Sequence, residues 1–259
     1  MNTIEDIEFA TAYTSGVHAG QLRKGTDTPY IEHPLAVAGL VNEYRGDNDQ
    51  FIAALLHDAV EDHGGMPMLD EIRWRFGDGV ADIVDHCTDS YSQKDEDWGT
   101  RKVRYLLNIP KTPRAALLVC ACDKLHNAQC ILADYQEIGE ALWDRFNPSR
   151  EQILWYYRAL VEMFRKAGDL PVIDELDEVV SAIEAAVLPI EERDEPEDDL
   201  RAEKLEIIDE IRRKAELGGP ESQMAMAALY AGGVVVPLDL EEAMKWLLRA
   251  TSTEGETPN

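Results

Sequence analysis

Apolar side chains recur at intervals of three and four residues along most of this chain. The pattern covers residues 3–18, 35–45, 50–60, 79–87, 112–132, 150–164 and 172–187. This spacing places apolar side chains on one face of an α-helix, and no pair of segments shows the alternation typical of β-strands. Turn-forming residues separate the segments, for example at 25–29, 46–48 and 147–149. The pattern therefore predicts an all-α fold.

An acidic stretch interrupts this pattern near residue 190. Residues 191–199 read EERDEPEDD and contain no apolar side chain. Like-charge repulsion and the lack of burial favour a solvated linker there. We therefore predict a main domain at 1–189, an acidic linker at 190–200, a helix pair at 201–250 and a disordered tail at 251–259.

The predicted helix pair resembles a Sel1-like repeat. Its first helix ends in Leu229-Tyr230-x-x-Gly233, and its second helix bears Ala243 and Trp246. Such repeats bury their apolar faces against neighbouring repeats. A lone copy must instead pack on the main domain, pair with a second copy of the chain or bind a protein partner. A simple two-helix extension capping the main domain is the alternative to a Sel1-like repeat.

Charge and composition exclude several classes of function. The chain has 51 acidic and 25 basic residues, giving a formal net charge of −26, which argues against binding nucleic acid or an anionic membrane. No apolar run approaches the roughly 20 residues of a membrane span, and the first residues show no export signal. The four cysteines form no spaced framework. We therefore expect a cytoplasmic protein with reduced thiols.

The candidate chemistry begins with the stretch His57-Asp58-Ala59-Val60-Glu61-Asp62, which follows an apolar run at 51–56. Residues four apart share a helix face, so a continuous helix would place His57 above Glu61 and Asp58 above Asp62. The preceding apolar run indicates a buried helix, and buried carboxylates need a partner or a metal ion. We therefore favour a metal site here over a solvated or salt-bridged face.

Two further segments supply donors of the same kind. His33 precedes Pro34 at the start of a predicted helix, and Asp123 lies within the helix predicted at 112–132. Together with His57 and Asp58, they offer two imidazole nitrogens and two carboxylates. This mixed set suits one divalent ion that keeps positions open for water and substrate.

Longer motifs carry a resemblance to a known family. The segments HAGQLRKG at 18–25, PYIEHP at 29–34, AALLHDAVED at 53–62 and DKLHN at 123–127 resemble the HD-type hydrolase domains of RelA/SpoT proteins. The resemblance spans about residues 5–165. It is closest to stand-alone small alarmone hydrolases, because nothing after residue 190 resembles the synthetase and regulatory parts of the long members.

The resemblance implies an HD-domain helical bundle and an activity. It implies that His33, His57, Asp58 and Asp123 bind one Mn²⁺ ion. The reaction would be hydrolysis of the 3′-pyrophosphate of ppGpp or pppGpp, giving GDP or GTP and pyrophosphate. The expected partner is therefore a small nucleotide alarmone.

Roles for the residues around the metal site follow from chemistry and resemblance together. Glu61 and Asp62 would orient or deprotonate the attacking water; holding a metal ligand in place or forming a salt bridge is the alternative. Arg23 and Lys24 would bind substrate phosphates, unless they are ordinary cations at a helix end. Asn127 lies four residues after Asp123 and could bond the ribose or a phosphate.

A second basic cluster and two departures from the family complete the site predictions. Arg101 and Lys102 are candidates for the pocket, although a solvated helix face explains them equally well. Arg150 is a candidate for the distal phosphates. Cys120 stands where the family usually has a basic residue, and His63 stands where a threonine is common.

Two other functions remain open from the sequence. One is an HD phosphohydrolase acting on another nucleotide, such as ppApp, a 5′-nucleotide or NADPH. The other is a non-catalytic interaction protein that uses the C-terminal helix pair. The complete donor set argues against the second function, since a binding module has no need of it.

Overall fold

The computed structural model describes residues 3–89, 98–187, 211–232 and 239–252. Within these ranges the chain is built from helices, and the one β-type pairing is an isolated bridge between Leu22 and Pro29. The prediction of an all-α fold is confirmed. The linker predicted at 190–200 lies outside the described residues, as does most of the predicted tail, from residue 253 onward.

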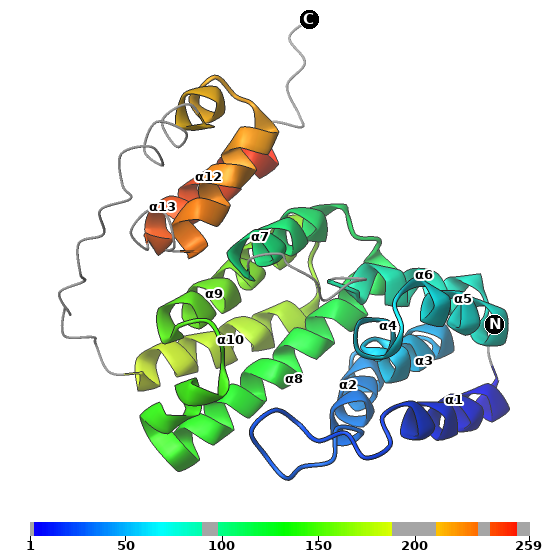
Figure 1. Cartoon of the computed structure of the whole chain (residues 1–259). Helices are drawn as coiled ribbons and strands as arrows, with labels where there is room; N and C mark the ends of the chain where they lie inside the picture. Colours follow the sequence, from blue (N-terminus) through cyan, green and yellow to red (C-terminus); the bar gives the residue numbers. More distant parts are fainter. Residues whose placement is uncertain (1–2, 90–97, 188–210, 233–238, 253–259) are drawn as a thin grey trace, which may run out of the picture.

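The main bundle is organised around the long helix α8 (Arg114–Ile138), which crosses its centre (Figure 1). The elements packed against α8 are α2 (Glu32–Glu43), α3 (Asn48–Leu56), α6 (Asp78–Cys87), α9 (Arg150–Ala167), α10 (Pro171–Ala186) and the 3-10 segment η2 (Gly139–Arg145). Every side chain of α8 from Ala116 to Asp123 is buried. A helix that is apolar on all sides belongs in an interior, so α8 forms the core of the domain.

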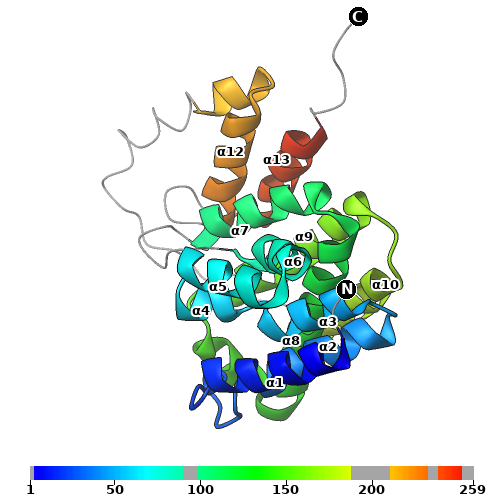
Figure 2. The same cartoon turned by 90° about the vertical axis from the view of Figure 1, so that its right-hand side faces the viewer.

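Three further helices cover the N-terminal side of the bundle (Figure 2). They are α1 (Ile4–Val17), α4 (Ala59–His63) and α5 (Met66–Phe76), with α1 packed on α3 and α5 packed on α6. Helices α1, α3 and α9 each begin with a capping box, in which the side chains of the cap residue and of the third helical residue bond each other's backbone N–H. These caps fix where the helices start.

Two helices were missed by the apolar pattern, namely α5 and α7 (Trp98–Asn108), which leads into the 3-10 turn η1 (Ile109–Lys111). On α5, Trp74 is 80% exposed and Met66 is 50% exposed, so its apolar residues do not lie on one face. On α7, buried Val103 and Tyr105 alternate with charged residues. Tertiary packing, rather than apolar spacing, selects these helices.

A tight loop between α1 and α2 carries residues toward the centre of the bundle. Arg23 N–H donates to the Thr28 carbonyl at 2.9 Å, and Tyr30 N–H donates to the Gln21 carbonyl at 2.9 Å. At its tip, Gly25 has φ +73°, and an added Cβ would lie 2.7 Å from the Arg145 side chain. Only glycine fits this backbone conformation and this close approach.

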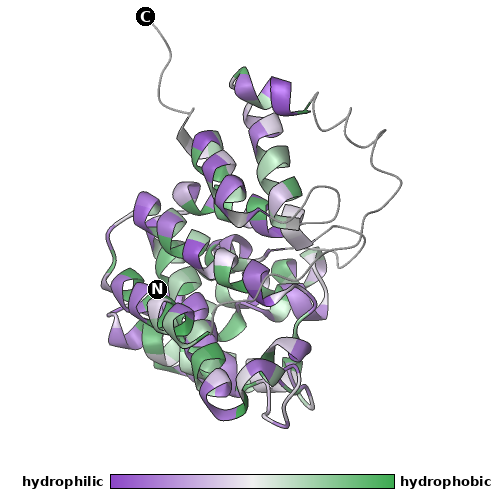
Figure 3. Cartoon of the chain, turned by 90° about the vertical axis from the view of Figure 1, so that its left-hand side faces the viewer, coloured by the Kyte–Doolittle hydropathy of each residue, from purple (hydrophilic) through white to green (hydrophobic). Residues whose placement is uncertain are grey.

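The C-terminal helix pair consists of α12 (Pro220–Gly232) and α13 (Leu240–Ser252), packed along each other. Ala243, Trp246 and Leu247 are buried within it. The pair also contacts the main bundle, because α12 lies on α7 and α13 touches α7 and α9. Helices of both parts have a hydrophobic and a hydrophilic side (Figure 3). Folding back on the main bundle is thus the option that the structure displays, while the Sel1-like identity stays a prediction.

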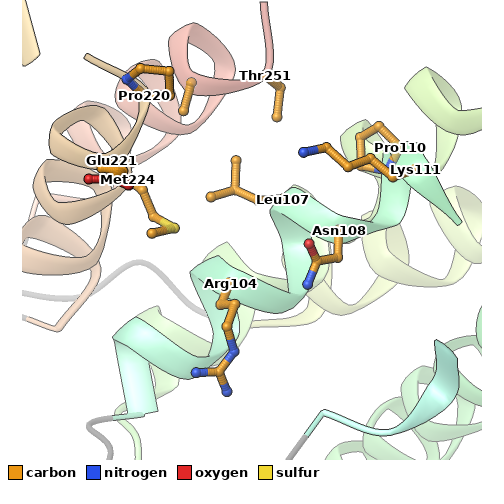
Figure 4. A pocket seen from close by; sticks show the side chains of 10 residues that line it. Arg104, Leu107, Asn108, Pro110, Lys111, Pro220, Glu221, Met224 and Thr251 are labelled. Atoms are coloured by element: carbon orange, nitrogen blue, oxygen red, sulfur yellow. The ribbon is translucent and has the colours of Figure 1, made fainter. Parts of the chain in front are cut away.

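A cavity of about 270 Å³ separates part of the pair from the bundle (Figure 4). Its walls come from α7 and η1 on one side and from α12 and α13 on the other. Leu107 and Met224 point toward each other across it. None of its lining residues is a predicted site residue.

No helix among the described residues combines the length and the apolar character needed to cross a bilayer.

Removal of the helix pair should destabilise the bundle. Truncation after Pro189 exposes the side of α7 that α12 covers and removes the bond from Gln152 to the Ala231 carbonyl. We expect a lower Tm in thermal unfolding, with roughly 2–4 °C lost per kcal/mol for a chain of this size. Truncation after Ser252 is the control and should leave Tm unchanged. Equal Tm values for both truncations would show that the pair contributes nothing to the bundle.

Candidate metal centre and its surroundings

His33 lies in the first turn of α2, with its imidazole buried in the bundle. Pro34 follows it at a position where a helix needs no backbone N–H. The Nε2 atom lies 3.4 Å from Asp58 Oδ2 and 3.2 Å from Asp123 Oδ1. On the other side of the ring, Nδ1 lies 2.8 Å from Nδ1 of His126. These contacts hold the ring with Nε2 facing the two carboxylates.

His57 and Asp58 lie at a break between two helices, since α3 ends at Leu56 and α4 begins at Ala59. The single helix predicted over 50–60 is therefore wrong. On a regular helix adjacent side chains point about 100° apart. His57 Nε2 and Asp58 Oδ2 nevertheless lie 3.0 Å apart. Asp62 N–H still donates to the Asp58 carbonyl at 2.9 Å, so one helical turn connects these two acids.

Asp123 reaches the same point from α8 and is 5% exposed. Its Oδ1 lies 3.5 Å from His57 Nε2 and accepts a 2.6 Å hydrogen bond from Asn127 Nδ2. Its Oδ2 accepts a 2.7 Å bond from Lys124 Nζ. The structure therefore brings all four predicted ligands together, from α2, the α3–α4 junction and α8.

Three of the donors, from His33, His57 and Asp58, form a group that could hold a metal ion, with one ligand atom of each within 4.8 Å of the others, and Asp123 contacts both imidazoles. Ligand bonds near 2.1 Å separate neighbouring donor atoms by about 3.0 Å in an octahedron and about 3.4 Å in a tetrahedron. The observed separations run from 3.0 to 3.5 Å. His57 Nδ1 is bonded to the Ala54 carbonyl at 2.8 Å, while His57 Nε2 is buried and faces the two carboxylates. This arrangement is typical of a metal-binding histidine, whose other nitrogen fixes the ring.

Charge within the cluster is balanced by its own members. Burial works to raise the pKa of Asp58, but the charge of His57 and bonds from both imidazoles hold that pKa well below its usual range. Burial acts likewise on Asp123, whose pKa is held low by Lys124 and the two histidines. Burial also opposes the His57 cation, yet the carboxylates raise its pKa well above the usual value. A metal ion that binds His57 must displace a proton from the imidazole, so the affinity of the site for metal should fall as pH falls.

A comparison with protein-family models matches the part of the chain that carries this cluster. The model described as "HD domain" matches residues 10–145, more than half of the 259-residue chain, and all four clustered residues lie inside the match. The chain belongs to the HD-domain family. Its HD domain is of the RelA/SpoT type, as the sequence motifs predicted.

Curated relatives of the HD domain include both long and short proteins. A GTP pyrophosphokinase of Myxococcus xanthus is 32% identical over 134 residues, which cover 49% of this chain and 17% of that protein. The guanosine-3′,5′-bis(diphosphate) 3′-pyrophosphohydrolase MESH1 of Xenopus tropicalis is 36% identical over 121 residues, or 46% of this chain and 65% of MESH1. The chain thus spans less than a fifth of the long relative and about two thirds of the short one.

A solved structure has the same fold. It is described as a metazoan ortholog of SpoT that hydrolyzes ppGpp, and it superposes with a TM-score of 0.56 at 24% identity. The match covers 70% of this chain and 97% of that one.

The two predicted catalytic acids of the HD domain point to different neighbours. Glu61 Oε1 lies 3.8 Å from Arg101 Nη1, and the N–H of Asp89 approaches Glu61 Oε2 at 3.4 Å. Burial and the charge of Asp89 raise the pKa of Glu61. Asp62 is exposed and accepts a 2.8 Å bond from Gln21 Nε2. The acids therefore occupy unlike environments, which favours unlike roles.

Two of the predicted phosphate-binding residues differ in their relation to the cluster. Arg23 donates to Asn127 Oδ1 at 3.0 Å, and Asn127 in turn bonds Asp123. This chain of bonds ties Arg23 to the metal-binding side of α8. Lys24 is exposed, with its Nζ 3.4 Å from Asn147 Oδ1.

The other basic candidates also differ from one another in their contacts. Lys102 bonds Asp89 at 2.7 Å and lies 5.1 Å above the Tyr156 ring, and Arg101 approaches both Asp89 and Glu61. The alternative of a solvated helix face is therefore wrong for Lys102, whose side chain is only 17% exposed. Arg150 is paired with two acids at the start of α9, at 2.8 and 3.1 Å, rather than with the cluster.

Several residues that support the cluster were not predicted from the sequence. The Tyr30 hydroxyl donates to Asp58 Oδ2, and burial together with the Asp58 charge raises the pKa of Tyr30, so it remains a donor. Lys124 neutralises Asp123 from the next position on α8. His126 orients His33, and burial and the His33 charge lower the pKa of His126 to about 4. Their closeness in sequence to His33 and Asp123 was the available signal.

Cys120 occupies a buried place below Asp123, with its Sγ 3.2 Å from Cys87 Sγ. Both thiols are free. No cation stands at position 120, but Lys124 supplies one a single helical turn later.

Loss of His126 should weaken metal binding without removing a ligand. His126→Ala frees the His33 ring, and loss of such an outer partner typically costs 10–100-fold in metal affinity. Mn²⁺ affinity measured by competition with a chelator tests this. His86→Ala, at an exposed histidine on α6, is the matched control and should bind as wild type. Equal affinities for the two variants would contradict the orienting role.

Proposed function

We propose that this chain hydrolyses the 3′-pyrophosphate of guanosine alarmones, converting ppGpp or pppGpp to GDP or GTP and pyrophosphate, with Mn²⁺ as cofactor. The observation that carries the proposal is the convergence of His33, His57, Asp58 and Asp123 on one buried point with unlike acids beside it. The names of the MESH1 relatives support the same reaction.

The proposed chemistry divides between the ion and the protein. A divalent ion held by the four ligands would lower the pKa of water and offset charge on a phosphoryl oxygen. Asp62, one helical turn from Asp58 and exposed, is suited to orienting the attacking water. Glu61, with its raised pKa, is suited to accepting and returning a proton.

Cations on two sides of the cluster would position the substrate. Arg23 is fixed by Asn127 on the α8 side, and its guanidinium can bind a phosphate with two parallel bonds. Lys102 and Arg101 lie on the Glu61 side, where their charges would offset the developing charge on the departing pyrophosphate. Lys24 and Arg150 are weaker candidates, because one is exposed and the other is already paired with two acids.

The direct test is pyrophosphate release from purified, Mn²⁺-loaded protein. The substrate panel should contain ppGpp, pppGpp, ppApp, 5′-nucleotides and NADPH. We expect release from the guanosine compounds, loss of release in the presence of a chelator, and none from His57→Ala. Preference for a 5′-nucleotide or NADPH would indicate another HD phosphohydrolase, and inertness toward all substrates would indicate a non-catalytic protein.

The paired substitution Glu61→Gln with Asp62→Asn should abolish turnover while Mn²⁺ remains bound. Both acids lie outside the four-donor set, and general acid–base groups contribute roughly 10²–10⁴-fold to rate. Steady-state hydrolysis and metal content measured on the same sample separate the two effects. A rate near wild type would refute the water-activating role.

The acid limb of the pH profile should respond to Asp89. Glu61 must be ionised to accept a proton, so activity is lost as pH falls through its raised pKa. Asp89→Asn removes a negative neighbour and leaves the Lys102 charge uncompensated, and both changes lower the pKa of Glu61. We expect the acid limb of kcat/KM, measured at saturating Mn²⁺, to move to lower pH. Asp85→Asn on the exposed face of α6 is the control, and an unmoved limb in Asp89→Asn would exclude Glu61 as the titrating base.

We further propose that the C-terminal helix pair is a separate unit that the reaction does not need. Every site candidate precedes residue 160, and the cavity at the junction contains none of them. The chain truncated after Pro189 should keep its specific activity at a temperature where it is folded. A truncated chain that is folded and binds Mn²⁺ but does not turn over would place the pair in the active site.

A further inference from the structure

A second group of possible metal donors lies outside the four-ligand cluster. It contains His18, at the end of α1, and Asp62 and His63, on α4. One donor atom from each of these residues can be chosen so that all three lie within 4.8 Å of one another. None of the three belongs to the four-ligand cluster, so this group is a distinct set of donors.

The geometry of the two imidazoles is that of neighbouring ligands. His18 Nδ1 and His63 Nε2 are 3.2 Å apart. Two nitrogens bound to one tetrahedral ion at 2.0–2.1 Å would be separated by roughly 3.3–3.4 Å. Gln21 Oε1 lies 2.8 Å from each of these nitrogens. The two rings and the carbonyl oxygen thus surround one small space.

Asp62 closes this space from the side of the proposed active site. Gln21 spans the group, because its oxygen meets the two imidazoles while its Nε2 donates to Asp62 Oδ2 at 2.8 Å. The ligand atoms of the two histidines and the carboxylate already lie within 4.8 Å of one another. The Gln21 carbonyl oxygen can also remain as a fourth donor.

The group is both held in place and open to ions. His18 is 3% exposed, and its ring lies against that of Tyr30 with centroids 4.8 Å apart. Asp62 and His63 are exposed, so an ion can enter from solvent.

We propose that His18, Asp62 and His63 form a second metal site, suited to a borderline divalent ion such as Zn²⁺. Two imidazoles with one carboxylate are typical ligands of zinc, whereas Mg²⁺ and Ca²⁺ prefer oxygen donors. A hydrogen-bonded network without a metal is the competing explanation. The two explanations differ in stoichiometry, because the network binds no ion.

Occupation of this site would engage the Asp62 carboxylate. This consequence rests on the proposed function, in which Asp62 orients water for the first site. Zinc at the second site would then inhibit hydrolysis by withdrawing Asp62, with no zinc needed in the four-ligand cluster.

Metal stoichiometry tests the site without any assay of activity. Full-length protein is stripped with a chelator, titrated with Zn²⁺ and followed by calorimetry, with elemental analysis of the loaded protein. We expect two ions per chain for wild type and for the control His86→Ala, and one ion for His63→Ala. His57→Ala should keep the second site and bind one ion. One ion in wild type, or two ions in His63→Ala, would overturn the proposal.

A second measurement tests the link to Asp62. Hydrolysis is followed in Mn²⁺ while Zn²⁺ is added, and His63→Ala should need at least tenfold more Zn²⁺ than wild type or His86→Ala for half inhibition. Equal inhibition of His63→Ala and wild type would overturn the link to Asp62. A chain that binds two ions but hydrolyses no alarmone would refute the proposed function and leave the second site standing. Hydrolysis of alarmone by a chain that binds a single ion would refute the second site and leave the proposed function standing.

Discussion

The rest of this structure depends on the meeting of two imidazoles, one buried carboxylate and one partly buried carboxylate. Asp123, His33 and His57 are each at most 5% exposed, and placing ionised groups in an interior costs several kcal/mol each unless opposite charge and hydrogen bonds compensate. Each member therefore needs the others, and the three chain segments that carry them must meet. The α3–α4 junction, the first turn of α2 and the buried part of α8 each supply one or two of these side chains.

Hydrogen bonds from neighbouring residues fix the orientation of these side chains. Tyr30 bonds Asp58, Lys124 and Asn127 bond Asp123, and His126 holds His33. Tyr30 and Asn127 bond the carboxylate oxygens that also face the imidazoles, whereas Lys124 bonds the second oxygen of Asp123. The loop that carries Tyr30 also carries Arg23, and its fold is fixed by Gly25 against Arg145. Metal binding and proposed phosphate binding therefore depend on the same loop.

The short helix α4 joins the two donor groups. Asp58 precedes its first residue, while Asp62 and His63 form its end. The helix has only five residues, so the two donor groups lie close together along the chain. The Tyr30 ring makes a second connection, since it lies between His18 and His33 in ring contact with both and bonds Asp58. An ion bound at one of the two donor groups would thus affect the other donor group through short, direct contacts.

The sequence determined the class of fold and the residues of the cluster, for reasons that are local. Apolar spacing of three and four residues identifies a helix wherever one face is buried, as in α8 and α9. Donor types at motif positions identified His33, His57, Asp58 and Asp123 before their distances were known. The missed helices α5 and α7 lack that spacing, because exposed apolar residues on α5 and interleaved charges on α7 obscure it.

Only the tertiary structure decided how the side chains around the cluster are used. Adjacent Glu61 and Asp62 diverge toward Asp89 and Gln21, which are distant in sequence from each other. Arg23 meets Asn127 across 104 positions, whereas Arg150 is taken up by nearby acids. The grouping of His18 with His63 likewise needs α1 and α4 to meet. Such pairings depend on contacts between segments far apart in the chain, and the free energy of those contacts is not encoded in the spacing of any one segment.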